Sequence, residues 1–140
     1  MRPDFKKGFT LIEIMMAIGL IGILVSILIP NMLRSRMYAN ENATQATLRS
    51  FASACENYAS YYGGFYPSTC GNLTSPRPPF FGYDIDDKTI DGYIFNVEFG
   101  GNNYTVTATP SPMQGRYDYR AVSGMVFTTC PKGTDNWEPL

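Results

Sequence analysis

The chain has 140 residues, with 11 Lys and Arg against 12 Asp and Glu, no His and three Cys. A nearly neutral, mildly acidic chain lacks the clustered cations of a nucleic-acid surface, so nucleic acid is not expected as a primary ligand. The absence of His removes the commonest general base and the commonest metal ligand, and no cofactor is expected. The length allows one modest domain in addition to a hydrophobic segment.

The N-terminal part of the chain has the pattern of a membrane anchor. A net positive stretch precedes an uninterrupted apolar run over residues 9–29. As a helix this run spans roughly 30 Å, which matches the hydrocarbon core of a bilayer. No small-residue cleavage site follows the run, so the segment is predicted to be retained as an anchor. The basic flank predicts that the N-terminus stays in the cytoplasm and that the rest of the chain lies outside.

Glu13 is the only charged residue between Lys7 and Arg34. A carboxylate within a membrane-spanning segment is costly, and by default it is a candidate functional residue. The alternative is a plain single-pass anchor in which Glu13 stays hydrated near the membrane surface. Glu13 lies one helical turn from Phe9, so cleavage before Phe9 would create an ammonium group beside it. That amine, or one on a neighbouring chain, is a possible ionic partner for Glu13.

The sequence KKGFTLIE at residues 6–13 resembles the processing motif of bacterial type IV prepilins and of the pseudopilins of type II secretion. The resemblance implies that a membrane-embedded prepilin peptidase removes the basic leader, residues 1–8, by cutting after Gly8. It further implies that the same enzyme methylates the new N-terminal residue, Phe9. In this family the motif glutamate corresponds to Glu13, and a proline ends the hydrophobic stretch, as Pro30 does here.

The same resemblance predicts a structural function rather than an enzyme. It implies a type IV pilus subunit that leaves the inner membrane through an assembly platform and forms a homopolymer through its N-terminal helices. Glu13 would then set the subunit register, and the segment between Gly22 and Pro30 would lose helical hydrogen bonds on assembly. The alternative within the family is a pseudopilin that forms a short periplasmic filament. An anchored enzyme or binding module is disfavoured, because no nucleophile–base pair or phosphate-binding loop is present.

Residues 31–62 have the periodicity of an amphipathic helix that continues the apolar run. One predicted face carries apolar residues at steps of three and four: Leu48, Phe51, Cys55, Tyr58 and Tyr62. The other faces are predicted to carry the polar residues, namely Arg34, Arg36, Glu41, Gln45, Arg49 and Glu56. Gly63 and Gly64 are predicted to end the helix. We therefore expect one nearly continuous helix from Phe9 to Tyr62, with a transmembrane part at 9–30.

The remaining residues, 63–140, are predicted to form a loop and a small β head. Alternation over 93–99 and 103–109, around a turn at 100–102, predicts a β-hairpin. Residues 117–129 predict one or two further strands with a turn at Ser123 and Gly124. The Pro-, Gly- and Asp-rich stretch 71–91 is interpreted as a connecting surface loop. The fold class is α+β, a long N-terminal helix packed by three or four antiparallel strands, which is the layout of pilins.

Three cysteines, Cys55, Cys70 and Cys130, allow three single disulfide pairings. By resemblance to pilins, which often have a disulfide around the C-terminal loop, Cys70–Cys130 is the leading pairing. It leaves Cys55 as a free thiol on the apolar helix face. Cys55–Cys70 is the close alternative because few residues separate the two. Metal binding and thiol catalysis are not expected, since no Cys-x-x-Cys pair or His accompanies these residues.

Four carboxylates, those of Asp84, Asp86, Asp87 and Asp91, lie within one short segment. Ca²⁺ favours such groups of oxygen ligands, and some pseudopilins bind calcium in their heads. Lys88 and Thr89 interrupt any EF-hand spacing, so a hydrated acidic loop is the preferred interpretation and calcium the weaker one.

Overall fold

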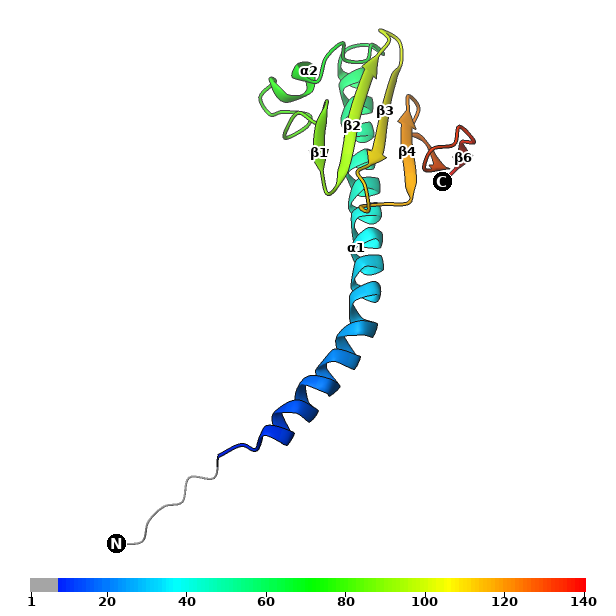
Figure 1. The fold of residues 1–140 in the computed structure, drawn as a ribbon. Helices are drawn as coiled ribbons and strands as arrows, with labels where there is room; N and C mark the ends of the chain where they lie inside the picture. The colour runs from blue at the N-terminus through cyan, green and yellow to red at the C-terminus, as the bar shows by residue number, and fades with distance from the viewer. Residues whose placement is uncertain (1–7) are drawn as a thin grey trace, which may run out of the picture. The chain divides into compact units, whose positions relative to one another are not determined.

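The computed structural model describes residues 8–140, and the predicted leader residues 1–7 lie outside the described part. The chain divides into two compact units, Met1–Ser35 and Arg36–Leu140. One helix, α1 (Leu11–Tyr61), supplies residues to both units (Figure 1). Its bounds differ from the predicted Phe9 and Tyr62 by two residues at the start and one at the end.

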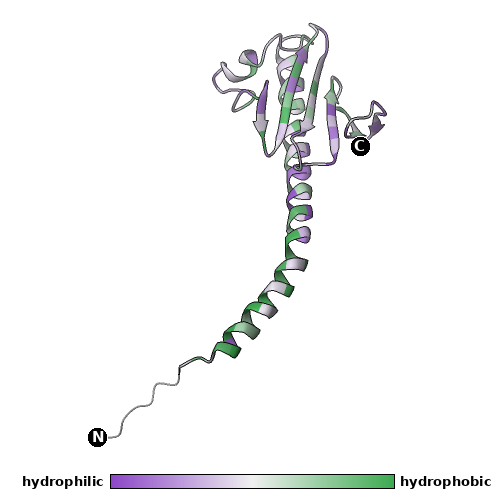
Figure 2. Ribbon diagram, in the orientation of Figure 1, coloured by the Kyte–Doolittle hydropathy of each residue, from purple (hydrophilic) through white to green (hydrophobic). Residues whose placement is uncertain are grey.

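Within the described residues of the first unit, 8–35, the side chains of helix α1 have no packing partner in the chain. Every described residue from Gly8 to Ser35 is exposed, and the helix continues through Pro30. Figure 2 shows this part of α1 as almost uniformly hydrophobic, whereas the part in the second unit alternates between hydrophobic and hydrophilic residues. Among the described residues, α1 contains the one stretch that is long and apolar enough to cross a membrane.

The second unit, which we call the head (Arg36–Leu140), contains an antiparallel sheet of six strands in the order β1-β2-β3-β4-β5-β6. After α1, its elements are α2 (Gly71–Thr74), β1 (Lys88–Ile90), β2 (Tyr93–Phe99), β3 (Tyr104–Pro110), β4 (Tyr117–Val122), β5 (Val126–Pro131) and β6 (Glu138–Pro139). The predicted α+β class and the β2–β3 hairpin are confirmed. The predicted number of strands, three or four, is wrong.

The two additional strands are short edge strands that leave little periodicity in the sequence. β1 pairs with β2 through a two-residue turn, because Ile90 lies opposite Tyr93. The turn residues Asp91 and Gly92 both have positive φ, 51° and 79°, as an Asp-Gly hairpin turn requires. β6 is only two residues long and pairs with Thr128 and Thr129 of β5.

The stretch 71–91 is not the surface loop that its composition predicts. It contains α2 and β1, and it buries three apolar side chains, Leu73, Phe81 and Ile85, to 0%, 9% and 0% exposure. Pro, Gly and Asp residues interrupt the chain between these positions, so no continuous helical or strand pattern marks them in the sequence. The segment closes one end of the core between α1 and the sheet.

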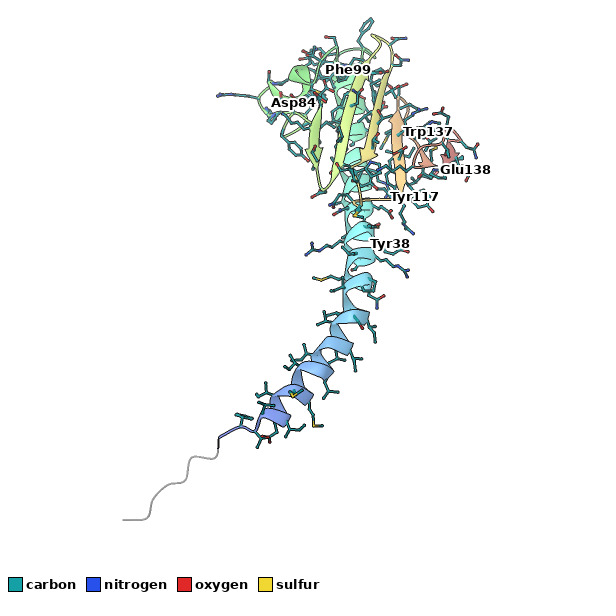
Figure 3. The ribbon with its side chains drawn as sticks, in the orientation of Figure 1. Tyr38, Asp84, Phe99, Tyr117, Trp137 and Glu138 are labelled. Carbon is teal, nitrogen blue, oxygen red and sulfur yellow. The ribbon has the colours of Figure 1, made fainter. Side chains whose placement is uncertain are left out.

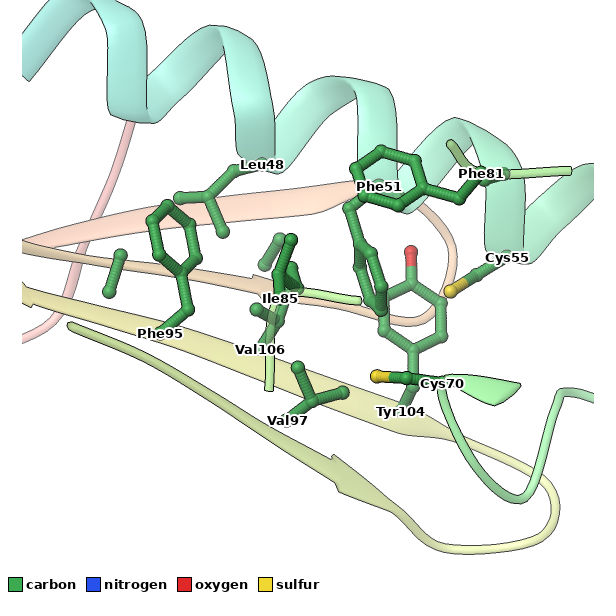
Figure 4. Packing of buried hydrophobic residues seen from close by; sticks show 14 of the residues in the cluster. Leu48, Phe51, Cys55, Cys70, Phe81, Ile85, Phe95, Val97, Tyr104 and Val106 are labelled. Carbon is green, nitrogen blue, oxygen red and sulfur yellow. The ribbon is translucent and has the colours of Figure 1, made fainter. Parts of the chain in front are cut away.

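The core of the head lies between α1 and one face of the sheet. The helix contributes Leu48, Phe51 and Cys55 at 2%, 1% and 0% exposure, as the apolar stripe predicts. Figure 4 shows these residues facing the sheet residues Phe95, Val97, Tyr104 and Val106. Phe51 packs edge-to-face on Phe81, with ring centroids 5.4 Å apart. Tyr62, also predicted on the stripe, is 45% exposed because the helix has ended before it.

The end of α1 follows from its two glycines. Gly63 adopts a φ of 71°, which only glycine reaches at little cost. The Gly64 N–H donates to the Ala59 carbonyl over 2.7 Å, the 6→1 hydrogen bond of a Schellman motif. The predicted stop signal is therefore confirmed at atomic detail.

Candidate assembly site

The first turn of α1 places Glu13 in a reciprocal hydrogen-bonded cap with Thr10. The Glu13 carboxylate accepts from the Thr10 N–H over 2.9 Å and from the Thr10 hydroxyl over 2.7 Å. In return, the Glu13 N–H donates to Thr10 Oγ1 over 3.4 Å. This is a capping box, in which the residue before the helix and the residue three positions later satisfy each other's polar groups.

The cap explains why a carboxylate can begin an otherwise apolar helix, but it does not neutralise the charge. Both donors of Thr10 are neutral, and among the described residues Glu13 forms no salt bridge. Sequence reasoning assigns a function to Glu13 and overlooks Thr10. The signal is present in the sequence, because a Thr followed three positions later by a Glu before an apolar run is the capping-box pattern.

The segment from Gly22 to Pro30 is helical but has weakened backbone hydrogen bonding. Pro30 has no N–H, so it cannot donate to the carbonyl of Ser26, four residues earlier. The Ser26 hydroxyl donates to the Ile23 carbonyl over 2.7 Å, a side-chain bond that competes with the helical ladder. Gly22 adds low helix propensity. Three consecutive turns of the helix therefore each carry one weakening feature.

Within the head, Glu41 binds Arg116, and we call this contact the Glu41 clamp. Helical periodicity predicts a different orientation for Glu41, on an outer face of the helix. Glu41 is buried at 5% exposure and faces the loop between β3 and β4. Its carboxylate accepts from the Arg116 backbone N–H over 3.1 Å, and from Nε and Nη2 of the same residue over 3.2 and 3.1 Å. The Arg116 guanidinium also lies 4.4 Å from the Tyr38 ring centroid. Figure 3 shows Tyr38 and Tyr117, which flank Arg116, at the same end of the head.

Glu56 forms the matching clamp near the other end of the helix. Its carboxylate accepts from the Gly124 N–H over 2.8 Å, in the turn between β4 and β5. It also accepts from the hydroxyls of Tyr66 and Tyr104, over 3.1 and 3.5 Å at the nearest oxygens. Burial is the main cause that raises the pKa of both tyrosines, so their hydroxyls stay protonated and act as donors.

Together these two glutamates fix strand β4 along the helix. Glu41 binds Arg116, just before β4, and Glu56 binds Gly124, just after it. The two glutamates lie about 22 Å apart at 1.5 Å per helical residue. Eight residues of extended chain between their partners cover about 26 Å. The near match lets β4 run in the same direction as α1 with both of its ends held.

The acidic segment does not gather its carboxylates into a metal site. Asp84 forms a 3.5 Å salt bridge with Lys88, and the Asp86 N–H that it accepts lowers the pKa of Asp84. Asp86 accepts from the Val97 N–H of β2 over 3.0 Å, and Asp91 belongs to the hairpin turn. Within the described residues, no group of three or more acidic, Cys or His side chains is suited to a metal ion. The weak calcium hypothesis for Asp84, Asp86, Asp87 and Asp91 gains no support.

The three cysteines, Cys55, Cys70 and Cys130, are buried free thiols in the structure. The Cys70–Cys130 disulfide is therefore not formed in it, and neither is the alternative pairing. The thiol of Cys130 donates to the Thr134 carbonyl over 2.7 Å.

Fold and site together define a class of protein: an α+β head and an exposed apolar helical unit that share one long helix, with a single capped glutamate in its first turn. Comparison with known proteins identifies the family to which this class corresponds. Residues 5–29 match the family model described as the prokaryotic N-terminal methylation motif. The chain therefore carries that motif across the start of α1, over the residues that include Phe9 and Glu13.

Matches to individual proteins extend the likeness to the head. The chain is 44% identical over 130 residues, covering 89% of this chain and 97% of the relative, to the type IV wide pilus major component PilA4 of Thermus thermophilus. It is 32% identical over 122 residues, covering 82% and 79%, to the type II secretion system core protein G of Escherichia coli. It is 34% identical over 90 residues, covering 64% and 57%, to the core protein G of Pectobacterium carotovorum. The chain belongs to the family of type IV pilins and type II secretion pseudopilins.

Proposed function

We propose that this chain is the structural subunit of a type IV pilus filament. The observation that carries the proposal is the first unit: an exposed apolar helix with one glutamate whose charge has no cationic partner among the described residues. Such a helix needs a membrane or other copies of itself to cover it. The 44% identity to a pilus major component, over 97% of that protein, supports the polymer. A structural subunit of this kind is not an enzyme.

Processing creates the missing cation. Prepilin peptidase cuts after Gly8, and the same enzyme methylates the amine of Phe9. The amine of one subunit pairs with Glu13 of its neighbour when the axial register is correct. A wrong register leaves both charges unpaired in an apolar filament core, which is strongly unfavourable. The Thr10 cap keeps the carboxylate hydrogen-bonded until that partner arrives.

The stretch from Gly22 to Pro30 unwinds during assembly. Pro30 and Ser26 have already removed or diverted hydrogen bonds of the ladder, so little is lost when this segment extends. Extension lets the helices of neighbouring subunits adjust in length while each head stays folded. The weakened turns lie in the first unit, and the clamps at Glu41 and Glu56 lie in the second.

Before assembly the subunit spans the inner membrane once through residues 9–30, with its N-terminus in the cytoplasm. The leader, residues 1–8, supplies the positive charge that sets this orientation. An inner-membrane assembly platform then extracts the subunit, and the mature chain becomes part of an extracellular filament. Partners are thus the processing enzyme, the platform and further copies of the chain.

A type II secretion pseudopilin is the second candidate. The observation that favours it is the identity of 32% to 34% to core protein G of two bacteria, over 79% and 57% of those proteins. The two candidates share processing, fold and polymerisation. They differ in the length and the location of the filament.

Mechanical shearing of cells tests the proposal. We expect long external fibres that contain this chain, with an N-terminal methyl-Phe9 found by mass spectrometry of the fibre. Replacement of Gly8 by a bulky residue is the matched variant, and it should leave the chain in the membrane with residues 1–8 still attached. A methylated chain that is confined to short periplasmic filaments would favour the pseudopilin. An intact leader on the functional protein would refute both candidates.

A further inference from the structure

Two of the three cysteines share one part of the head core. Cys55 of α1 and Cys70, the residue before α2, are 0% and 8% exposed, and both belong to the continuous cluster between helix and sheet. Figure 4 shows the two side chains beside Tyr104, in the space where α1, the 70–73 segment and β3 meet. Cys130 is also fully buried, but it lies outside this cluster.

The electrostatic surroundings of the two thiols agree with this shared location in the core. Burial raises the pKa of Cys55 to about 12, and the next largest cause is the charge of Cys70. Burial also raises the pKa of Cys70 to about 12, helped by the Asp84 carboxylate, which accepts its hydrogen bond. A thiolate at Cys70 therefore disfavours a thiolate at Cys55.

Cys130 occupies a different place with a different partner. It lies on β5 opposite Asp118 of β4, two strands beyond β3 in the sheet order. At about 4.8 Å between strands, β3 and β5 are about 10 Å apart, beyond the span of roughly 7 Å that a disulfide bridges between Cα atoms. Its thiol is hydrogen-bonded to the Thr134 carbonyl and lies 3.0 Å from the Thr134 hydroxyl oxygen. A cysteine packed beside β3 is therefore poorly placed to reach it.

We propose that Cys55 and Cys70 form the disulfide of this protein in an oxidising compartment, and that Cys130 remains a free thiol. In the reaction, one thiolate attacks the disulfide of an oxidant and displaces one oxidant thiolate. The second cysteine thiolate then attacks the mixed disulfide and displaces the other. Two protein thiols lose two protons and two electrons, and the oxidant disulfide becomes two thiols, so atoms and electrons balance.

The bond would join the last two turns of α1 to the segment that closes the core. It would enclose the 14 residues from Glu56 to Thr69, which contain the exposed end of the helix and the Gly63–Gly64 turn. The site thus connects parts of the head that share no strand pairing. Only the presence of the head outside the cytoplasm rests on the proposed function; the pairing itself rests on the core.

The decisive experiment uses the full chain in detergent, reduced and then equilibrated with oxidised and reduced glutathione. Free thiols are then blocked with N-ethylmaleimide in urea, which exposes the buried Cys130 thiol, and the peptides are mapped by mass spectrometry without reduction. We expect one linked peptide pair that contains Cys55 and Cys70, with the label on Cys130 alone. A link that includes Cys130, or three labelled cysteines, overturns the proposal.

Matched variants show whether the linked pair depends on the two proposed cysteines or results from misfolding. Cys130→Ser should keep the linked pair, whereas Cys55→Ser and Cys70→Ser should each give two labelled thiols and no link. A Cys130→Ser chain without the link would overturn the proposal, and its circular dichroism shows whether the head has folded.

Labelling the chain in intact cells separates this proposal from the proposed function. A link that forms in glutathione and also in cells supports both. A link that forms in glutathione and is absent from cells supports the pairing and contradicts the extracytoplasmic location. Absence in both conditions contradicts the pairing and leaves the filament proposal to its own test.

Discussion

Helix α1 carries three glutamates, and the two units of the molecule treat them differently. In the head, Glu41 and Glu56 are satisfied by donors 75 and 68 positions further along the same chain. In the first unit, the Glu13 carboxylate has one partner within the described residues 8–35, Thr10, three positions away. The head is complete as one copy, whereas the apolar unit has a charge and an exposed surface that a single copy leaves uncovered. We therefore interpret the glutamates with distant partners in the same chain as stabilising the fold, and Glu13 as a residue for assembly.

The largest effect should come from removing the uncompensated charge. Glu13→Val eliminates the ionic partner of the neighbouring amine, so filaments should fall by at least roughly tenfold in sheared fractions. The cleaved, methylated chain should still be found in the membrane at normal amounts, because Val is favourable there. The matched control is Thr10→Ser, which keeps the hydroxyl of the cap and should leave filaments intact. Abundant normal filaments from Glu13→Val would remove the distinction between the two kinds of glutamate.

The next largest effect should come from the head clamp at Glu41. Arg116 is 45% exposed, but Arg116→Ala leaves the buried Glu41 carboxylate without a cation, and an uncompensated buried charge is destabilising. The melting temperature of the head should fall by roughly 10 °C. Calorimetry of the detergent-solubilised chain would measure it.

Two further variants test whether the effect at Arg116 belongs to the pair. Arg36→Ala removes an exposed arginine that makes no ion pair among the described residues, and it should leave the melting temperature almost unchanged. Glu41→Leu combined with Arg116→Leu should be less destabilised than Arg116→Ala, since no unpaired charge remains. If the double variant melted at a lower temperature than Arg116→Ala, the effect of Arg116→Ala would not come from an unpaired Glu41 charge alone.

What the sequence predicts well is what short-range periodicity encodes. The stripe through Leu48 and Phe51 and the β2–β3 hairpin are visible within a few turns or residues, and the structure confirms both. Helical periodicity predicts that Glu41 lies on an outer, solvent-facing side of the helix. It cannot reveal the partner, Arg116, which lies far away in the sequence. Long-range pairs of this kind are decided by tertiary packing, so helical periodicity alone misplaces them.

Other features of the structure have a local cause that the sequence does contain. The charge of Asp91 suggests a calcium ligand, whereas the Asp-Gly pair that it forms with Gly92 is a strong signal for a two-residue hairpin. The structure uses the pair in this second way, and β1 exists because of that turn. Thr10 and Glu13 form a capping box that is likewise written in the sequence. At both places a short sequence pattern predicts the local structure, a hairpin turn in one case and a helix cap in the other.

A smaller effect is expected at the second clamp. Glu56→Ala removes the acceptor of the Gly124 N–H and of two tyrosine hydroxyls, and it should cost about 1–2 kcal/mol in the free energy of unfolding. Glu56→Gln keeps one carbonyl oxygen and should cost less. Urea denaturation followed by tyrosine fluorescence gives both values. Equal costs for the two variants would show that the charge, rather than the hydrogen bonds, holds the β4–β5 turn.

The buried thiols predict a dependence on alkaline pH that the first unit, which contains no cysteine, does not share. In the reduced head the pKa of Cys55 and Cys70 is raised to about 12, whereas an unfolded cysteine ionises near pH 8.5. The folded state therefore holds these protons more tightly. Stability should be fully present below about pH 8.5 and should decline as the pH rises towards 12. Urea midpoints between pH 8 and 10.5 should fall faster with reductant than after oxidation, and identical slopes would contradict the proposed pair.

The smallest effect compares one glycine from each unit. Gly63 has a φ of 71°, and a Cβ atom added there would meet no other atom within 4 Å, so Gly63→Ala adds backbone strain without a clash. It should destabilise the head by about 1 kcal/mol. Gly19 is exposed within α1 of the first unit and is equally free of neighbours, and Gly19→Ala should leave the urea midpoint of the head unchanged while it favours the helix. If Gly19→Ala shifted that midpoint as much as Gly63→Ala does, the two units would not unfold independently, and the contrast drawn between them would fail.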